Sequence, residues 1–405
     1  MKIFDPKLRL NAISNNFIPF YKDNQILIEN ISYPLPRMFI YTANFANFEQ
    51  FLWNQNEVNH QYHLSGYGTT NYEALLGFLG ESAERYSYAV SFLSLKDNSF
   101  TDSYENLKDK KLPFQIIKQY NSDFEEDTII DWCVCNTLNG ENILVPLELI
   151  VFDNFKVDKK FQGVSTGCAA HESFFDATIN GILEYLQLDS FNLWWYSGFL
   201  GKDVDITNNL NYIGIGNDFL YYFDIKVSNI KFDKPVDVYV CEIFGKFPNV
   251  PQYTVGVQAG LDSDKAINRA ILEALTILEY NFNLPWFNAE LYKSVNSETC
   301  FDDLDKNVIY YSKNGKPDLF KQEFINWNKA SIITKEELLK YISNEYKNAT
   351  VLDISVPDLK YLNQHIARVY IPELIPMMVH NNVYYQHTRF LKFGGVRNDF
   401  PSPLP

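Results

Sequence analysis

Three long segments of this chain carry apolar residues at helical spacing, and segments of the strand type lie between them. The helical segments run from residue 72 to the early nineties, from 173 to 196 and from 262 to 282. No linker rich in Gly, Ser or Pro divides the chain into independent domains. Helices and strands that alternate within one continuous chain predict an α+β (mixed α/β) fold.

The strand-type segments are short and apolar, and turn residues bound them. The clearest are YPLPRMFIYTANF, ENILVPLELIVF (residues 141–152), VDVYVCEIFGKF, YTVGVQAGL and HIARVYIPEL. Residues 96–127 are polar and charged, which indicates a surface excursion. The turn SGYGTT leads into the first helix, and its N-cap is expected at Thr69, Thr70 or Asn71.

Charge and composition exclude several classes of protein. The net charge is −15, which argues against binding to nucleic acid or to an anionic membrane, because both need a basic surface. No apolar run has the length of a signal peptide or a membrane span. Five scattered cysteines fit reduced thiols, so we expect a cytoplasmic protein. Cys133 and Cys135 share one face of a strand, either as structural residues or as a metal pair.

The second helical segment carries a polar stripe. On a helical wheel, Asp176, Asn180, Glu184 and Gln187 fall within a sector roughly 80° wide. Two readings stay open at this point: a solvated helix face, or a site beside which the small residues Ala177 and Gly181 allow close approach.

The other two helical segments also combine acids with arginine. Glu81, Glu84 and Arg85 point into one sector roughly 100° wide within an apolar frame. Arg269 and Glu273 are spaced i and i+4, which also suits a plain surface ion pair. Gathered carboxylates need a cation, hard oxygen ligands favour Mg²⁺, and Arg recognises phosphate. The set therefore indicates a nucleotide-phosphate site, although no GxxxxGK[ST] loop is present.

Four stretches in order resemble one known family. They are GFLGESAERY, STGCAAHESFFDATINGILEYLQLDSFNLWW, RAILE and the terminal PSPLP, and together they resemble the YcaO family from about Gly66 to the last residue. The resemblance implies a YcaO-like fold around a nucleotide site. It divides the chain into a strand-rich segment over residues 1–60 and a catalytic domain over residues 61–405.

The family's motifs carry over position by position. Glu81, Glu84 and Arg85 match the first motif, and the RxxxE motif is intact as Arg269 and Glu273. In the second motif, Asp176 and Asn180 stand for Glu and Gln, and Glu184 matches the element that follows. The resemblance thus implies nine nucleotide-binding residues: Glu81, Glu84, Arg85, Asp176, Asn180, Glu184, Gln187, Arg269 and Glu273. It implies Mg²⁺ ligands among them at Glu81, Glu84, Glu184 and Glu273.

This chain departs from the family pattern at several positions. Gly77 and Ala169 stand where Ser is usual, and Gln187 and Leu188 replace an acid and an Arg. Losing the acid removes a potential Mg²⁺ ligand, although the carbonyl oxygen of Gln187 is still a candidate ligand. Losing the Arg removes a phosphate contact. The departures put nucleotide affinity in question more than the fold.

Family members use ATP and Mg²⁺ to activate a backbone amide of a peptide. A terminal PxPxP, here Pro401, Pro403 and Pro405, resembles the azoline-forming branch that makes thiazole/oxazole-modified microcins. The resemblance implies a flexible tail that reaches the peptide site, with a catalytic role for the three prolines and the terminal carboxylate. The expected activity is that of an ATP-dependent peptide cyclodehydratase that forms thiazoline or oxazoline rings from Cys, Ser or Thr.

Several partners follow from the same resemblance. They are a ribosomal precursor peptide, a separate leader-peptide-binding protein, a flavin-dependent azoline dehydrogenase and further copies of this chain. Two alternatives remain. One is a catalytically weak scaffold or peptide-binding subunit, motivated by Gly77, Ala169, Gln187 and Leu188, and the other is a thioamide-forming enzyme, which the PSPLP ending disfavours.

Overall fold

A computed structural model gives the fold of residues 27–31, 38–45, 62–95, 98–151, 159–296, 304–328, 331–378 and 383–404. The chain forms two compact units, each built from separate stretches of sequence. The first comprises Met1–Asn30, Met38–Ile182 and Ile342–Pro372, and the second comprises Ile31–Arg37, Leu183–Tyr341 and Glu373–Pro405. The division expected at residue 60 stays a prediction, since most of residues 1–60 lie outside the described part.

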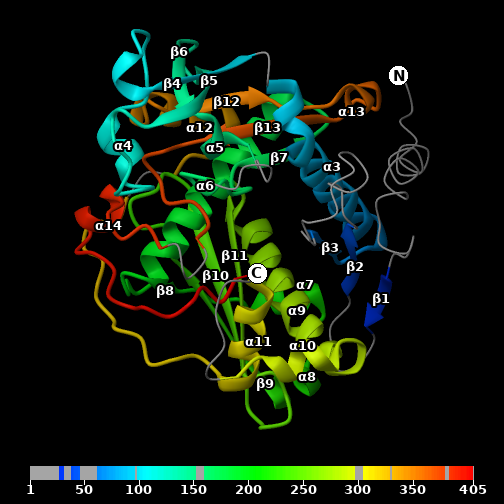
Figure 1. Ribbon diagram of the computed structural model, residues 1–405. Helices are drawn as coiled ribbons and strands as arrows, with labels where there is room; N and C mark the ends of the chain where they lie inside the picture. Colours follow the sequence, from blue (N-terminus) through cyan, green and yellow to red (C-terminus); the bar gives the residue numbers. More distant parts are fainter. Residues whose placement is uncertain are drawn as a thin grey trace. The chain divides into compact units, whose positions relative to one another are not determined.

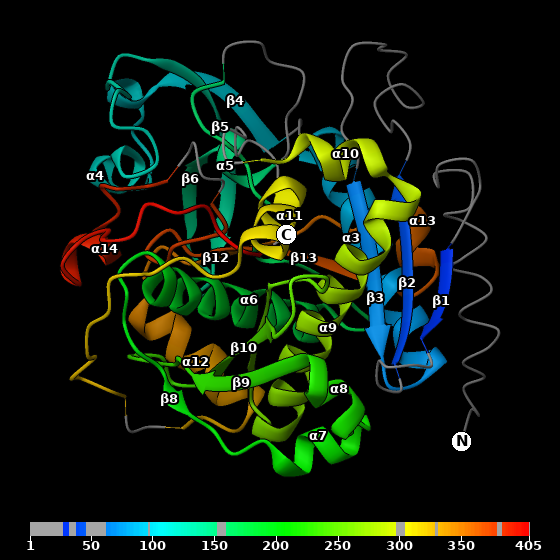
Figure 2. The ribbon, with the colours of Figure 1, turned by 90° about the horizontal axis from the view of Figure 1, so that it is seen from below.

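The first unit contains two sheets. One has the order β1-β2-β3, and the other has the order β4-β5-β12-β13-β7, with β6 paired to β5. Figures 1 and 2 show these sheets, in which the late strands β12 and β13 lie between early ones. The elements of this unit are β1 Leu27–Ile31, β2 Met38–Phe45, β3 Tyr62–Gly68, α3 Asn71–Leu95, β4 Ser99–Ser103, η4 Tyr104–Asn106, α4 Phe114–Lys118, β5 Ile129–Thr137, β6 Asn142–Pro146, α5 Leu147–Ile150, β7 Cys168–His171, β12 Thr350–Asp353, α13 Pro357–Tyr361 and β13 His365–Tyr370.

The second unit has one sheet with the order β11-β10-β9-β8, and α9 packs on β10 and β11. Helices α6 (Phe174–Trp195) and α12 (Lys335–Glu345) begin in one unit and end in the other. The remaining elements are β8 Lys202–Asp203, α7 Thr207–Ile213, α8 Asn217–Tyr222, β9 Phe223–Asn229, β10 Asp237–Gly245, β11 Tyr253–Gly260, α9 Ser263–Phe287, α10 Ala289–Ser294, α11 Leu304–Asn314 and α14 Thr388–Lys392.

The mixed α+β class predicted from the sequence is confirmed, and the three long helices are α3, α6 and α9. Side chains cap their first turns. Thr70 Oγ1 accepts from the N–H of Glu73, whose carboxylate accepts from the N–H groups of Thr69 and Thr70. Asp262 caps α9 by accepting from the N–H of Lys265. Local capping thus fixes where each helix starts.

The expected strand over residues 141–152 is only half correct. Strand β6 ends at Pro146, and residues Leu147–Ile150 form the short helix α5. All four residues of α5 are buried, Glu148 included. Apolar composition therefore indicated burial correctly but could not separate a short buried helix from a strand. Residues 96–127, expected as a surface excursion, include β4 and α4.

Helix α3 packs closely on β3 at Gly66. A Cβ on Gly66 would lie 2.2 Å from the Ala74 carbonyl oxygen and 2.2 Å from the Phe78 nitrogen. Only glycine lets the strand approach the helix this closely. Gly77 on the helix is different, because a Cβ there meets nothing nearer than the Cα of Gly66 at 3.7 Å.

These contacts predict opposite effects for two Gly→Ala substitutions. Gly77→Ala should stabilise the first unit by about 0.5–1 kcal/mol, since the helix gains propensity without a clash. Gly66→Ala should lower stability by about 1–3 kcal/mol, because backbone atoms must move. Urea unfolding followed by circular dichroism measures both. Equal effects from the two substitutions would contradict the packing of β3 on α3.

Candidate functional site

The acids of α3 are held by backbone N–H groups. Ser65 of β3 donates to Glu81 Oε2 at 2.7 Å, and Glu81 Oε1 lies 3.4 Å from the Arg85 guanidinium. Glu84 Oε1 accepts from the N–H of Ala170 in β7 at 2.8 Å. All three motif side chains on α3 are partly exposed. Each is therefore oriented by the protein while remaining within reach of solvent.

The polar stripe of α6 has one side chain bonded at the helix N-terminus and others that are exposed or partly exposed to solvent. At its start, Ser173 Oγ donates to Asp176 Oδ2 at 2.8 Å and accepts from the Asp176 N–H. His171 Nδ1 lies 3.6 Å from the same carboxylate oxygen. Asp176 thus closes the helix N-terminus. Further along, Asn180 is exposed and Glu184 is partly exposed.

Close approach beside the stripe, which the sequence suggested, occurs at Gly181. A Cβ there would lie 2.7 Å from the Gly167 carbonyl oxygen and 2.9 Å from Val369 Cγ2. The partner that comes close is therefore the protein's own backbone. This contact seats the first half of α6 against β13 and the segment before β7.

In the second unit, the motif residues of α6 and α9 contact β11. Gln187 Oε1 accepts from the Ala259 N–H at 3.1 Å, and Glu273 Oε2 accepts from the Val257 N–H at 2.6 Å. Arg269, one turn before Glu273, is exposed. Leu188 is 5% exposed and is part of the core. The side chain that replaces the family's Arg therefore points away from solvent.

These four contacts share one feature. Strands β3, β7 and β11 each lie at the edge of a sheet. Within the described part of the chain, their outward N–H groups have no strand partner, so they need other acceptors. The motif side chains supply them: Glu81 for Ser65, Glu84 for Ala170, Glu273 for Val257 and Gln187 for Ala259. The sequence did not reveal these donors, because a backbone N–H carries no residue signature.

Two tyrosines of α3 tie the helix to neighbouring segments of the first unit. The Tyr88 hydroxyl donates to the Val164 carbonyl oxygen at 2.9 Å, and burial raises its pKa to about 12, against the opposing charge of Arg368. The Tyr86 hydroxyl donates to Asp358 at 3.2 Å, and burial together with that carboxylate raises its pKa to about 12. Both hydroxyls stay protonated at neutral pH and act as fixed hydrogen-bond donors.

The PSPLP tail is packed, in contrast to the flexible tail expected from the sequence. Residues 401–404 are buried, with Ser402 at 2% and Leu404 at 3% exposure. The Tyr311 hydroxyl donates to the Pro401 carbonyl oxygen at 2.6 Å. Pro405 lies outside the described residues. Of the three prolines expected in catalysis, Pro401 and Pro403 thus belong to the folded second unit.

The donor set has the chemistry that Mg²⁺ and a nucleotide require. Among the described residues, no three His, Cys, Asp or Glu side chains gather into a metal cluster, and Cys133 and Cys135 are buried free thiols. Mg²⁺ does not need such a cluster, because it usually binds one or two carboxylates plus phosphates and water. A carboxylate has about four acceptor positions, so the bond to a strand N–H does not by itself exclude Glu81 or Glu273 as a ligand. The acids on α3, α6 and α9 fit this requirement.

Gln187 fits a different part of the same requirement. Its carbonyl oxygen accepts from Ala259, which leaves its amide nitrogen as the outward group. An amide N–H donates to phosphate oxygen and does not ligate a cation. Coordination of Mg²⁺ by the carbonyl oxygen of Gln187, which the sequence left open, stays a prediction.

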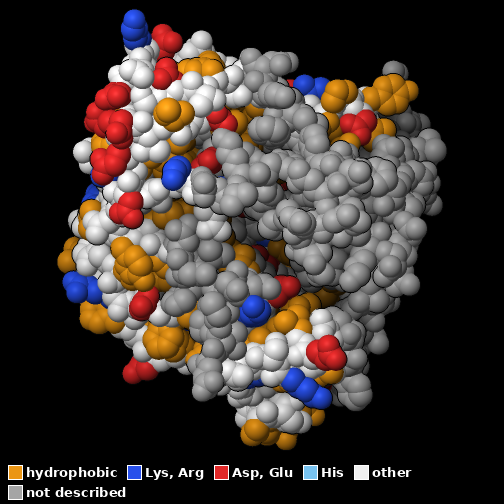
Figure 3. Space-filling view, in the orientation of Figure 1, with side chains coloured by type: hydrophobic (Ala, Val, Ile, Leu, Met, Phe, Trp, Pro, Cys, Tyr) orange, Lys and Arg blue, Asp and Glu red, His pale blue; other side chains and the backbone are white. Residues whose placement is uncertain are grey.

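Surface character agrees with the acidic composition. On the face drawn in Figure 3, Lys and Arg side chains of the described residues are scattered and do not form one basic patch. Within the described part of the chain, no helix has the length and apolar character needed to cross a membrane.

The protein has an α+β fold in which acidic side chains on α3 and α9 bond to the N–H groups of edge strands. A family model described as YcaO cyclodehydratase, ATP- and Mg²⁺-binding, matches residues 65–375. The chain belongs to the YcaO family, whose cofactors are ATP and Mg²⁺. No curated protein matches the sequence.

Several solved structures share the fold. A heterocyclase in complex with substrate and cofactor is 17% identical with a TM-score of 0.64, covering 99% of this chain and 57% of that one. YcaO from Methanopyrus kandleri bound with AMPPCP and Mg²⁺ is 13% identical with a TM-score of 0.59, covering 91% of each chain. The E. coli microcin synthetase McbBCD complex with pro-MccB17 bound is 14% identical with a TM-score of 0.65, covering 94% of this chain and 96% of that one. This chain thus spans little more than half the heterocyclase.

The bond from Ala170 to Glu84 makes Glu84→Gln a sharp test of the site. Gln keeps a carbonyl oxygen for the Ala170 N–H, removes the negative charge and replaces the second oxygen with an NH₂ group. Mg²⁺-dependent ATP binding, measured by calorimetry, should weaken at least about tenfold, while the melting temperature stays unchanged.

The matched control is Glu336→Gln, which removes the same charge from an exposed position on α12. It should leave ATP binding intact. Wild-type affinity in Glu84→Gln would remove Glu84 from the nucleotide site. A fall in melting temperature would instead indicate a structural role for its charge.

Proposed function

We propose that this chain is an ATP- and Mg²⁺-dependent cyclodehydratase subunit. It acts on a ribosomal precursor peptide and forms thiazoline or oxazoline rings from Cys, Ser or Thr. One observation carries the proposal, in a chain of the YcaO family. Motif side chains on α3, α6 and α9 accept hydrogen bonds from the N–H groups of edge strands. The folded PSPLP tail supports the azoline-forming branch.

The chemistry explains why such residues are needed. A Cys thiol or a Ser/Thr hydroxyl attacks the preceding amide carbonyl, and the amide oxygen must then leave carbon. Bound ATP with Mg²⁺ supplies the phosphoryl group that makes this oxygen a leaving group. The protein aligns the reactants and stabilises negative charge, which is the main work in phosphoryl transfer.

Specific residues have roles in this scheme. Glu81, Glu84, Glu184 and Glu273 would hold Mg²⁺, because they are hard oxygen donors. Arg85 and Arg269 would contact phosphate oxygens, and Gln187 would donate its amide N–H to the same anion. Asp176 and Asn180 would complete the nucleotide contacts from α6. The tail prolines 401, 403 and 405 would line the peptide site.

Partners follow from the same proposal. The E. coli microcin synthetase McbBCD is a multi-subunit complex solved with pro-MccB17 bound. By analogy, this chain would take a precursor peptide presented by a leader-peptide-binding protein. A flavin-dependent dehydrogenase would oxidise the azoline product, and this chain would associate with copies of itself. The reducing cytoplasm is the compartment that suits its free thiols.

Reconstitution tests the proposal directly. The purified chain is incubated with a candidate precursor peptide and its partner protein, with ATP and Mg²⁺, and the peptide mass is measured. Each ring formed should remove the mass of one water, and omitting Mg²⁺ should abolish the change. Exchange of oxygen for sulfur would identify thioamide formation instead.

A second candidate, a scaffold subunit with weak or no catalysis, is favoured by two observations. Leu188 is buried in the core, and the carbonyl oxygen of Gln187 is engaged by Ala259. The site therefore lacks one cationic and one anionic group of the family pattern. Peptide binding without any mass change, in a chain that also fails to bind ATP, would support this candidate.

Gln187→Glu should strengthen Mg²⁺ binding if the site is catalytic. The new carboxylate still accepts from the Ala259 N–H and adds a negative charge beside the metal. The Mg²⁺ concentration for half-maximal ATP binding should fall several-fold, which a titration at fixed ATP measures. Unchanged or weaker Mg²⁺ dependence would place Gln187 outside the metal's reach.

A further inference from the structure

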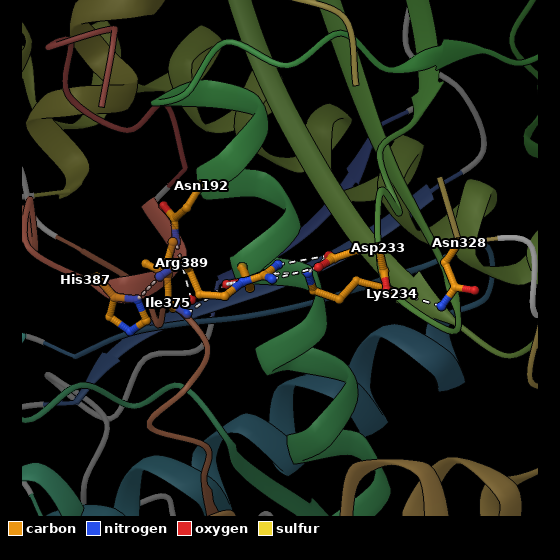
Figure 4. Close-up of polar contacts among 8 residues, drawn as sticks. Asn192, Asp233, Lys234, Asn328, Ile375, His387 and Arg389 are labelled. Atoms are coloured by element: carbon orange, nitrogen blue, oxygen red, sulfur yellow. Dashed lines mark hydrogen bonds and ion pairs between the residues drawn. The ribbon is translucent and has the colours of Figure 1, made fainter. Parts of the chain in front are cut away.

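The C-terminal segment is tied to α6 at two places. At the first, α14 contributes Arg389 to a buried ionic cluster with Asp189 of α6 and with Asp233 and Lys234 of the β9–β10 connection (Figure 4). Arg389 Nε donates to Asp189 at 3.0 Å, and Nη1 donates to Asp233 Oδ2 at 2.7 Å. Lys234 Nζ lies 2.5 Å from Asp189 and 2.7 Å from Asp233.

The cluster contains two carboxylates and two cationic side chains, so its formal charges balance. Asp189 and Lys234 are fully buried, and Arg389 is nearly so. Burial by itself raises the pKa of Asp189, but the charges of Arg389 and Lys234 outweigh it and lower the pKa below its ordinary value. The carboxylate therefore stays ionised at neutral pH. Buried ion groups of this kind add little net stability, but they tolerate few alternative arrangements. The cluster thus fixes α14 on α6.

Backbone bonds extend this first tie. The Ile375 N–H donates to Asp189 Oδ1 at 3.0 Å (Figure 4). Asn192 Nδ2 donates to the Pro376 carbonyl oxygen at 3.0 Å. His387 Nδ1 accepts from the Arg389 N–H at 3.2 Å and caps the short α14. The segment that enters the second unit after β13 is therefore held by the same face of α6.

The second tie lies at Trp195, the last residue of α6, and at Tyr196 directly after it. Trp195 is six residues beyond Asp189, which is about 9 Å along the helix axis. The carbonyl oxygen of Tyr196 accepts from the N–H groups of Arg397 and Asn398. Asn398 is 5% exposed, and both ends of its amide are used. Its Oδ1 accepts from the Phe320 N–H at 2.7 Å, and its Nδ2 donates to the Trp195 carbonyl oxygen at 2.8 Å.

The tail leaves directly from this second tie. The Trp195 indole N–H donates to the Phe400 carbonyl oxygen at 3.0 Å, and Tyr311 donates to the next carbonyl, that of Pro401. The Leu404 N–H donates to Ser402 Oγ at 3.2 Å. Proline at 401 and 403 fixes two further φ angles. Bonds and backbone restraint therefore continue from Asn398 to residue 404.

We propose that Asn398 is a positioning residue that sets where residues 401–404 of the tail lie. This inference rests on the proposed function, in which the tail lines the peptide site. Asn398 acts through the tail and makes no contribution to nucleotide binding. Because the tail is already folded in the second unit, it loses no further conformational entropy when peptide binds.

A double-mutant cycle tests this coupling. The variants are Asn398→Asp, truncation after Phe400, and both together. Asp keeps the acceptor for the Phe320 N–H but places a carboxylate oxygen against the Trp195 carbonyl. In the full chain, Asn398→Asp should lower kcat for ring formation about tenfold, the effect of losing one buried hydrogen bond, with ATP affinity unchanged by calorimetry.

In the truncated chain, Asn398→Asp should have no further effect on kcat, because the element through which it acts is gone. The control Asn208→Asp makes the same change at an exposed position on α7 and should match wild type. An equal fall in kcat with and without the tail would overturn the proposal. A loss of ATP affinity in Asn398→Asp would overturn it as well.

A readout without activity keeps the inference separate from the proposed function. Ser402→Cys places a thiol at a buried tail position, and its modification by a thiol reagent is followed by mass spectrometry of the C-terminal peptide. Modification should be slow with Asn398 and about tenfold faster with Asn398→Asp. Equal rates would show that Asn398 does not hold the tail. Absence of ring formation in wild type would count against the proposed function and leave the labelling result standing.

Discussion

The unpaired N–H groups of edge strands are the constraint on which the candidate site depends. An edge strand exposes donors that must find acceptors, and β3, β7 and β11 find them in the motif side chains of α3, α6 and α9. Each bond also fixes one oxygen of the side chain, so the orientation of the remaining oxygen is set by the sheet. A carboxylate placed in this way loses little rotamer freedom when it meets a cation. The hydrogen bonds that satisfy the edge strands are therefore the same bonds that orient the candidate site residues.

The first half of helix α6 belongs to the first unit and its second half to the second unit. Its first half is pressed onto Gly167 and β13 through Gly181, and its second half is buried on nearly all sides. Polar groups in that buried half must be satisfied internally, and Asp189 and Asn192 meet the C-terminal segment for this reason. Arg368 plays a comparable part in the first unit. It is fully buried and donates to the carbonyl oxygens of Leu149, Ile150 and Thr166, which secures α5 and the segment directly before β7.

The sequence predicts the elements whose signals are local and misses those that depend on long-range partners. The start of α3 was expected at Thr69, Thr70 or Asn71, and the Thr70–Glu73 capping box confirms this because its chemistry lies within four residues. Helix α5 was missed because burial hides the difference between strand and helix periods. The candidate site residues were named from spacing and resemblance, and their nucleotide contacts stay a prediction. Their strand partners and the tie of Asn398 to Trp195 span up to about 200 residues, which no local pattern records.

The surroundings of positions 77, 187 and 188 show what the residues that depart from the family pattern contact in the fold. At position 77, the space beside Gly66 accommodates a Cβ, so glycine is not required there by packing. At position 188, leucine is a core residue, and its apolar burial of roughly 2 kcal/mol stabilises the unit that carries the site. At position 187, the amide keeps the bond to β11 that an acid would also make. At positions 187 and 188 the side chains therefore serve the fold, Gln187 through its bond to β11 and Leu188 through its burial. We expect the loss of charge at these two positions to act on the affinity for Mg²⁺ and phosphate and not on the fold.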